Sequence, residues 1–212
     1  MKIKYLGHSS FQISSSSILV MDPYNQKIGE LPKDLTADVV TVSHQHFDHN
    51  FTEGVAGNPV VIDEPGEFSI KGFEIKGIQS FHDNEGGTQR GENIIFKINA
   101  EGITICHMGD LGHILTAEQV QAIGKVDVLM IPVGGFYTID APTAIQVIKQ
   151  INPKIVLPMH YKPQNSALQL QIEGVEKFNN LLGWKVIEQT GELEINDTKL
   201  SSNDQKIVLF KL

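Results

Sequence analysis

The sequence predicts a layered α/β protein, and two observations carry this prediction. The N-terminal half contains short apolar segments of strand length, separated by turn residues such as Gly, Asn and Ser. From Thr116 onward, apolar residues recur every three or four positions, which is typical of amphipathic helices. Further apolar runs of strand length lie between the helical segments, so strands and helices interleave.

The strands expected in the N-terminal half begin with a meander. The polar run 14–17 forms a turn between two apolar segments, and Asp22-Pro23 ends the second of them. The expected strands are Lys2–Leu6, Ser10–Ile13, Ile18–Met21, Val39–Val42, Val60–Ile62, Glu67–Ile70, Phe73–Ile78, Asn93–Ile98 and Ile103–Cys106.

Three helices are expected in the C-terminal half. Thr116 and Asp140 are suitable N-caps, and Pro142 suits a first helical turn. The apolar stripes are Ala117, Val120 and Ile123, then Ile145, Ile148 and Ile151, then Leu168, Ile172, Val175, Phe178 and Leu182. We interpret the last stripe as core packing rather than a cofactor site. The strands expected here are Val128–Ile131, Ile155–Leu157, Trp184–Ile187, Glu192–Ile195 and Ile207–Phe210.

Composition favours an ordinary globular protein. The 212 residues, 41% of them hydrophobic, suit one domain spanning residues 1–212. The one cysteine, Cys106, excludes a disulfide framework, and any metal site must therefore use nitrogen and oxygen ligands. Neither a signal-peptide core nor a run of about 20 apolar residues occurs, so we expect a cytoplasmic protein without a membrane span.

The net charge argues against a nucleic-acid partner. At −8 the chain has no basic stripe to neutralise phosphates. Bound metal ions would add local positive charge, so a short nucleotide substrate is disfavoured rather than excluded. Edge strands and helices could support a homo-oligomer, but no feature of the sequence fixes one.

The histidines stand where expected strands end. Val39–Val42 leads to His44, Ile103–Cys106 leads to His107 and Asp110, and Ile155–Leu157 leads to His160. Ligands collect at the carboxyl ends of strands in layered α/β sheets, so these residues should meet at one edge. The full set of histidines is His8, His44, His46, His49, His82, His107, His113 and His160.

The segment His44-Gln45-His46-Phe47-Asp48-His49 points to metal binding. Residues two apart in an extended segment project to the same side, so His44 and His46 can bind one ion. Asp48 and His49 can then face a second ion. Imidazole with carboxylate suits Zn first, with Mn or Fe as alternatives. Two such ions would leave net positive charge, attract an anionic substrate and acidify a bound water towards a pKa of about 7.

These residues resemble the H-x-H-x-D-H signature of the metallo-β-lactamase superfamily. The other motifs of that family follow in order as Asp22, His82, Gly109-Asp110 and His160. The segments 7–11, 132–138 and 158–161 further resemble a small branch of metal-dependent hydrolases related to ascorbate-6-phosphate lactonase. The resemblance implies a four-layer αββα sandwich with the metals at the sheet edge.

The resemblance also implies a ligand set. His44, His46 and His82 would bind the first metal, and Asp48, His49 and His160 the second. Asp110 would bridge the two ions, and Asp22 would orient a ligand histidine by accepting its free N–H.

Each assignment has a structural alternative. His107 competes with His82 for the third motif, and we favour His82 because His107 lies only three residues before Asp110; His107 then supports a ligand or lines the pocket. His160 could be a buried structural histidine, and Asp22 a turn residue. The roles of His8 and His113 stay open between pocket group and polar cap. The residues expected to line the substrate pocket are His8, Gly134, Gly135, Tyr137, Thr138 and Tyr161.

We expect a hydrolase that cleaves an ester, lactone or phosphoester bond of a small, anionic substrate with a hydroxide held by two metals. The catalytic assignments are Asp48, a candidate proton donor to the leaving group, and Asp110. The alternatives are a nuclease or phosphodiesterase acting on nucleotides or RNA, a thioesterase, an oxygen-reducing diiron protein and a non-catalytic metal-bound module. The diiron alternative would require a carboxylate where His46 stands.

Overall fold

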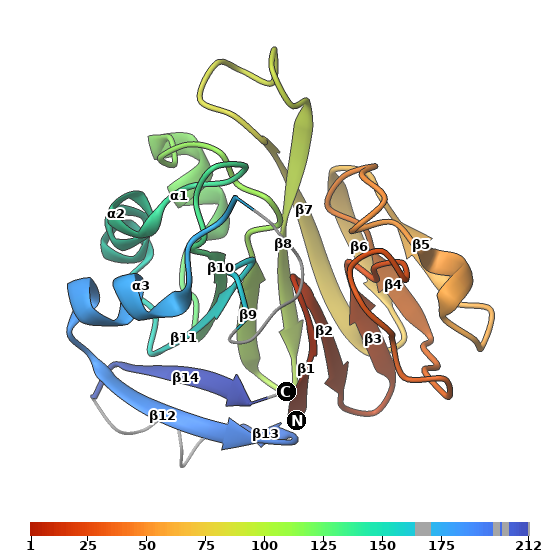
Figure 1. Ribbon diagram of the computed structural model, residues 1–212. Helices are drawn as coiled ribbons and strands as arrows, with labels where there is room; N and C mark the ends of the chain where they lie inside the picture. Colours follow the sequence, from red (N-terminus) through yellow and green to blue (C-terminus); the bar gives the residue numbers. More distant parts are fainter. Residues whose placement is uncertain (164–170, 197–199, 201–203, 212) are drawn as a thin grey trace.

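The computed structural model describes residues 1–163, 171–196, 200 and 204–211. Two large β-sheets face each other, and helices flank them (Figure 1). The layered α/β class expected from the sequence is therefore confirmed, including the paired sheets of the expected sandwich. The helices of the described segments include none with the length and apolar character that crossing a bilayer requires.

The first sheet has six strands in the order β13-β1-β2-β3-β4-β5. Its bounds are β1 Lys2–Gly7, β2 Ser10–Ser14, β3 Ile18–Met21, β4 Val39–Thr41, β5 Val60–Ile62 and β13 Leu193–Glu194. β1 to β3 form an antiparallel meander, and β3, β4 and β5 run parallel to one another.

The second sheet has eight strands in the order β12-β14-β11-β10-β9-β8-β7-β6. Its bounds are β6 Gly66–Ile70, β7 Phe73–Phe81, β8 Glu92–Ala100, β9 Ile103–His107, β10 Val128–Pro132, β11 Ile155–Met159, β12 Lys185–Thr190 and β14 Lys206–Lys211. β9, β10 and β11 are parallel, whereas β6, β7, β8 and β9 pair antiparallel. All these strands lie within a few residues of the bounds expected from the sequence.

Side chains that alternate along the strands build two separate cores. In β10, Val128 and Met130 point into the core between the two sheets, where Phe11 and Phe96 also lie. Leu129 and Ile131 point to the other face, under the helices. β10 is therefore buried on both faces, which explains its continuous apolar run.

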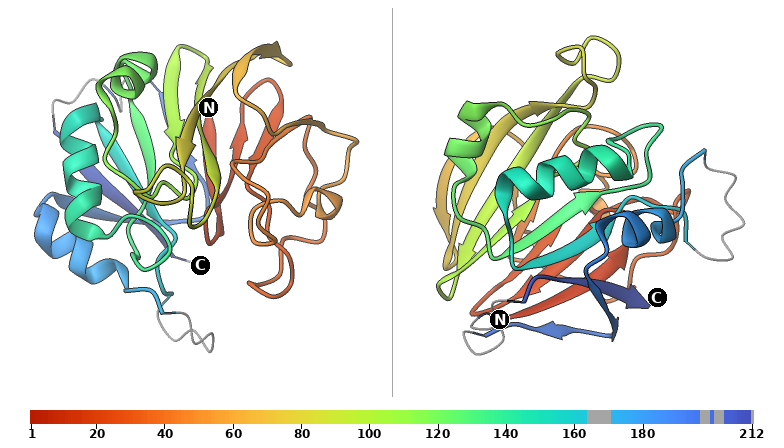
Figure 2. Two further views of the ribbon diagram at one scale, coloured as in Figure 1. Left: turned by 90° about the horizontal axis from the view of Figure 1, so that it is seen from above. Right: turned by 90° about the vertical axis from the view of Figure 1, so that its left-hand side faces the viewer.

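The outer faces of the two sheets are covered differently. Helices α1 (Ala117–Ile123), α2 (Ala141–Ile151) and α3 (Val175–Leu182) pack on the second sheet, as the two views of Figure 2 show. The outer face of the first sheet is covered by the segments 22–37 and 50–57, which include the 3₁₀ helix η1 (Thr52–Gly54). These segments bury a smaller apolar cluster against β3 and β4.

The helix starts follow the expected caps. Thr116 accepts the backbone N–H of Gln119 in a capping box, and Asp140 accepts that of Thr143. The third helix begins later than expected. Leu168 lies outside the described residues, and Ile172 precedes the helix, which is capped by Gly174. The Glu173 N–H donates to the Gly134 carbonyl, which holds this stretch against the loop after β10 instead of in a helix.

The strand directions bring several chain segments to one edge of the sandwich. The pairings make β1, β3 and β4 parallel in the first sheet, and β7, β9, β10 and β11 parallel in the second. Two backbone hydrogen bonds join the sheets at this edge: the His160 N–H donates to the His8 carbonyl, and the Ile94 N–H to the Ser43 carbonyl. The segments that follow all these strands therefore meet there.

Candidate metal centre

Six strand ends each contribute one side chain to this edge. β1 leads to His8, β3 to Asp22, β4 to His44, β7 to His82, β9 to Asp110 and β11 to His160. The remaining candidates come from the turn after His44, in which the His49 and Asn50 N–H groups both donate to the His46 carbonyl. This turn returns Asp48 and His49 towards the strand ends.

Left-handed backbone helps three of these residues leave their strands. His8, Asp22 and His160 have φ angles of 54°, 44° and 49°. Such angles are strained for residues other than glycine. Each of them directly follows a strand, where the change of direction aims the side chain across the edge instead of along the sheet.

The Asp110 carboxylate lies at the centre of the site. Its Oδ2 is 3.2 Å from Nε2 of both His82 and His160, 3.3 Å from His49 Nε2 and 3.9 Å from His44 Nε2. Asp110 is 2% exposed, so water does not compensate its charge. Imidazoles from both sheets thus converge on one carboxylate oxygen.

Around Asp110 the side chains form two main groups. In the first, His44, His46 and His82 have ligand atoms within 4.8 Å of one another, and in the second His8, Asp48, His49 and His160 do. A third set, His44, His49 and Asp110, connects the two. The structure therefore brings together all seven residues expected to be metal ligands.

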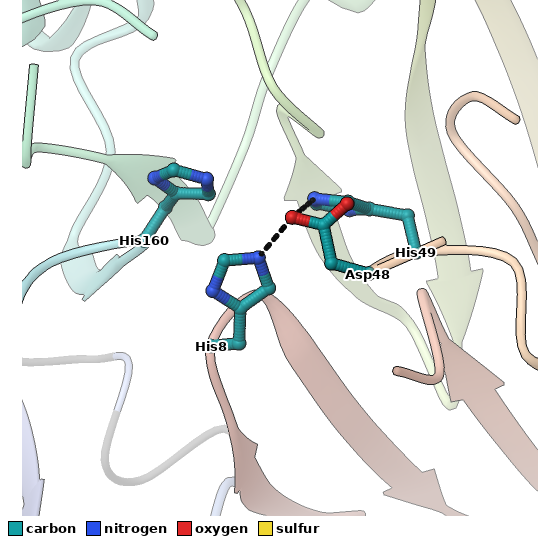
Figure 3. A group of neighbouring side chains, drawn as sticks. All are labelled: His8, Asp48, His49 and His160. Carbon is teal, nitrogen blue, oxygen red and sulfur yellow. Dashed lines mark hydrogen bonds and ion pairs between the residues drawn. The ribbon is translucent and has the colours of Figure 1, made fainter. Parts of the chain in front are cut away.

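His8 joins the second group, although the sequence left its role open. In Figure 3 its ring lies between His160 and Asp48. His8 Nε2 is 3.2 Å from Asp48 Oδ2, and the His8 and His160 ring centroids are 4.5 Å apart. His8 is thus a further candidate ligand or proton carrier.

Unpartnered polar atoms indicate that the site is built for cations. His44 Nε2, His49 Nε2 and Asp110 Oδ1 are buried, and none of them has a hydrogen-bond partner in the described structure. Leaving buried polar atoms unpaired costs about 1–3 kcal/mol each. Imidazole nitrogens with carboxylate oxygens suit Zn, Mn or Fe. The residues present therefore fit divalent ions.

Burial and neighbouring charges set the protonation of the site. Burial, helped by the neighbouring His49, lowers the pKa of His44 to about 2; burial, helped by His160, lowers that of His8 to about 4. Burial alone would lower the pKa of His49, yet the Asp110 and Asp22 carboxylates raise it well above its ordinary value. A neutral imidazole is the metal-binding form, so His44 and His8 are ready to bind at neutral pH.

Asp22 orients two of these histidines. Its Oδ2 is 2.8 Å from His49 Nδ1 and accepts the Ser43 hydroxyl at 2.6 Å. The same hydroxyl lies 2.9 Å from His44 Nδ1, so it can accept a hydrogen bond from that ring nitrogen while donating to Asp22. With both Nδ1 atoms engaged, the Nε2 atoms of His44 and His49 face Asp110. No pattern in the sequence indicates the part played by Ser43.

His107 lies behind the site. It is fully buried, its Nε2 donates to the Ser9 carbonyl at 2.8 Å, and its Nδ1 accepts the Gly109 N–H. His107 thus ties the end of β9 to the turn that carries His8. His113 Nε2 accepts the Phe81 N–H, and His113 is in none of the groups of candidate metal ligands that the described residues form.

A cavity of about 520 Å³ opens onto the ligand residues. Its wall includes His8 and Tyr137, two of the residues expected to line the pocket. The other four, Gly134, Gly135, Thr138 and Tyr161, are not among the residues that line it.

Close backbone packing explains the position of Gly134. A Cβ there would lie 2.2 Å from the His160 carbonyl oxygen. The glycine thus lets the loop after β10 approach the end of β11, instead of letting the chain approach a substrate. Gly135, with a φ of 67°, turns the chain beside Asp140.

The side chains of Thr138 and Tyr161 do not line the cavity. Thr138 is buried, and its hydroxyl donates to the Ile139 carbonyl. Tyr161 packs against the core beneath the helices, where burial raises its pKa to about 12.

Six residues of the cavity wall were not expected there from the sequence: Ile28, Phe47, Gln89, Arg90, Gly91 and Ile172. Phe47 lies within the histidine motif, so its proximity was foreseeable. Arg90 lies in a loop whose sequence carries no periodic signal, and Ile172 belongs to an apolar stripe that we interpreted as core packing; only the folded chain brings the two residues to the site.

The chain is similar to several known proteins. Residues 2–160 match the family described as beta-lactamase superfamily domain. A UPF0173 metal-dependent hydrolase of Nanoarchaeum equitans is 34% identical, over 76% of this chain and 84% of that protein. A UPF0173 metal-dependent hydrolase of Thermococcus kodakarensis is 28% identical, over 90% of this chain and 97% of that protein. A crystal structure from Thermotoga maritima, named as a candidate Zn-dependent hydrolase of the metallo-beta-lactamase superfamily, superposes with a TM-score of 0.82 at 38% identity, covering 99% of this chain and 97% of that one.

Proposed function

This chain belongs to the beta-lactamase superfamily, and from that membership we propose that it is a metal-dependent hydrolase with a two-ion centre, cleaving an ester, lactone or phosphoester bond of a small substrate. The relatives named above as metal-dependent hydrolases support the general activity. The number of ions and the type of bond are our inference. The lactonase-related branch named from the sequence stays a prediction.

The observation that carries the proposal is the convergence on Asp110. Four imidazoles from different strand ends and turns lie within 3.2–3.9 Å of its Oδ2. One carboxylate oxygen cannot accept four hydrogen bonds well, whereas a carboxylate between two cations suits this arrangement. We propose that His44, His46 and His82 hold one ion, that Asp48, His49 and His160 with His8 hold the other, and that Asp110 lies between them.

The residues divide the remaining work. When bound, such ions acidify a water and polarise the scissile oxygen. Asp22 and Ser43 keep His44 and His49 in the tautomer that presents Nε2 to the centre. Asp48 lies on the cavity wall, 3.2 Å from His8 Nε2, and although burial alone would raise its pKa, the hydrogen bond with His8 holds that pKa below its ordinary value. The carboxylate is therefore ionised, and we propose that it takes a proton from the attacking water and passes it to the leaving group.

The size and charge of the molecule favour a small substrate. The cavity of about 520 Å³ is in the range of pockets for small molecules. A net charge of −8 gives little attraction for a nucleic-acid backbone. We therefore keep nucleotides and RNA as alternatives to be tested rather than as a second proposal.

The test combines metal analysis with turnover. Elemental analysis of the purified protein should find about two divalent ions per chain. The loaded protein should cleave at least one of a lactone, an aryl ester and an aryl phosphodiester, with a thioester and a short RNA as comparisons. Chelation should abolish turnover, and added Zn or Mn should restore it.

Variants make this test specific. Asp110→Asn should reduce turnover at least about 100-fold and weaken both ions, because it changes the shared carboxylate. Asp34→Asn, an equal change at an exposed site, is the matched control. Full activity of metal-free protein, or loss of only one ion in Asp110→Asn, would contradict the proposed centre.

A further inference from the structure

Arg90 brings a positive charge to the wall of the cavity. Among the described residues that line this cavity, it is the one Lys or Arg. Its guanidinium lies 5.8 Å from the Tyr137 ring centroid, within cation–π range. Tyr137 lines the same wall, so the guanidinium stands above an aromatic surface that faces the cavity.

The loop that carries Arg90 is fixed by Asp83. The buried Asp83 carboxylate accepts four backbone N–H groups at 2.8–2.9 Å, from Glu85, Gly87, Gln89 and Arg90 itself. A hydrogen bond from the His82 N–H to the Gly91 carbonyl closes the base of the loop. The backbone of Arg90 is therefore positioned relative to His82, and little backbone freedom is lost when a ligand binds.

Among the described residues, no acidic side chain forms an ion pair with Arg90. The ion pairs found in the described part of the chain do not include it. The carboxylates that line the cavity, Asp48 and Asp110, are engaged with histidines. A half-buried guanidinium without a carboxylate partner is a ready site for an anionic group, which it can bind through two parallel hydrogen bonds.

Apart from Gln89 and the candidate ligands, the other side chains of the wall are apolar. Ile28, Phe47 and Ile172 line the cavity with Tyr137. Phe47 is 50% exposed and Tyr137 38%, so two aromatic rings remain open to a ligand. Exposed aromatic surface beside a fixed cation matches a molecule with an apolar body and an anionic end.

We propose that Arg90 determines substrate specificity by binding a carboxylate or phosphate group of the substrate remote from the scissile bond, while the apolar wall contacts the substrate body. This inference rests on the proposed function only in placing the scissile bond at the metal centre. Asp83 acts as a positioning residue for Arg90.

The first test compares two esters that differ by one terminal carboxylate group. Mono-4-nitrophenyl glutarate ends in a carboxylate, and 4-nitrophenyl butyrate does not. Arg90→Gln should lower kcat/KM for the glutarate ester at least about ten-fold, mainly through KM, and change the butyrate ester less than about two-fold. Arg90→Lys should recover part of the loss, and Lys33→Gln, at an exposed lysine, is the charge-matched control.

The second test measures binding without turnover. Glutaranilate, the anilide analogue of the glutarate ester, is titrated by calorimetry into metal-loaded wild type and Arg90→Gln, with metal content verified in both. The variant should bind at least about ten-fold more weakly. Equal binding by both proteins, or no binding by the wild type, overturns the role of Arg90. If binding depends on Arg90 but neither ester is cleaved, the role of Arg90 stands and the proposed hydrolysis of such esters is contradicted.

Discussion

Gly134→Ala is a direct test of how the strand ends position the ligands. The added Cβ would lie 2.2 Å from the His160 carbonyl oxygen, whereas real Cβ atoms essentially never come within 3.0 Å of another atom. The loop after β10 and the end of β11 must therefore separate by about 0.8 Å or more, since both contacting groups are backbone. His160 moves with its own carbonyl.

The size of this shift predicts two effects. Metal sites tolerate about 0.2 Å of error in ligand distance, so a displacement several times larger should break the bond from His160. Overpacking of this kind costs about 1–3 kcal/mol of folding free energy. For a protein of this length that amounts to a decrease in Tm of about 2–12 °C.

Two measurements check these effects. Calorimetry of the metal-free proteins gives the change in Tm, and elemental analysis after dialysis against buffered Zn gives the metal content, which should fall from about two ions to about one. Gly29→Ala is the control, because its Cβ would meet only the Tyr24 ring, at 3.5 Å. A Gly134→Ala protein with two ions and the wild-type Tm would refute the reasoning.

Three further predictions follow from other contacts. Gly112→Ala places a Cβ 2.2 Å from the backbone nitrogen of Asp83, the residue after His82, and should release the ion assigned to His82. The double variant with Gly134→Ala should then retain neither ion. Retention of one ion by the double variant would show that both changes disturb the same ion. Asp22→Asn should weaken metal binding about 10–100-fold in chelator competition, with Asp34→Asn unchanged, and an unaltered affinity would exclude the orienting role. Burial raises the pKa of the Cys106 thiol from 9.0 to about 12, so the stability that this shift contributes is complete below pH 9 and is lost as the pH rises towards 12. In urea unfolding, Cys106→Ala should therefore lose less stability than the wild type over that pH range. An identical pH profile for the two proteins would contradict this.

Much of the fold followed from local patterns in the sequence. β-Branched runs bounded by turn residues predicted the strands, and the caps Thr116 and Asp140 predicted two helix starts. The start of the third helix was predicted too early, because residue spacing alone cannot show that Ile172 lies before the helix. The hydrogen bond from Glu173 to Gly134, which holds that stretch, joins residues far apart in the sequence.

The site was predictable where several residues share one motif or follow a buried strand. Gly134 was expected at the pocket, whereas the structure packs it against the His160 carbonyl, because a glycine shows that backbone approaches closely but not which backbone it is. Arg90 went unnoticed since the loop 83–91 has neither periodicity nor a metal-ligand pattern, and its geometry depends on the four N–H groups that Asp83 collects. Ser43 was missed for a similar reason, because a serine after a strand is ordinary until Asp22 lies beside it.

The left-handed backbone at His8, Asp22 and His160 has a consequence for protein engineering. Each such conformation costs about 1–3 kcal/mol, a cost that glycine would avoid. A library selected for thermal resistance alone should therefore enrich glycine at these three positions. The selected proteins would be thermally stable but would have a damaged metal centre. Any stabilisation campaign on this scaffold needs these positions held constant from the first round.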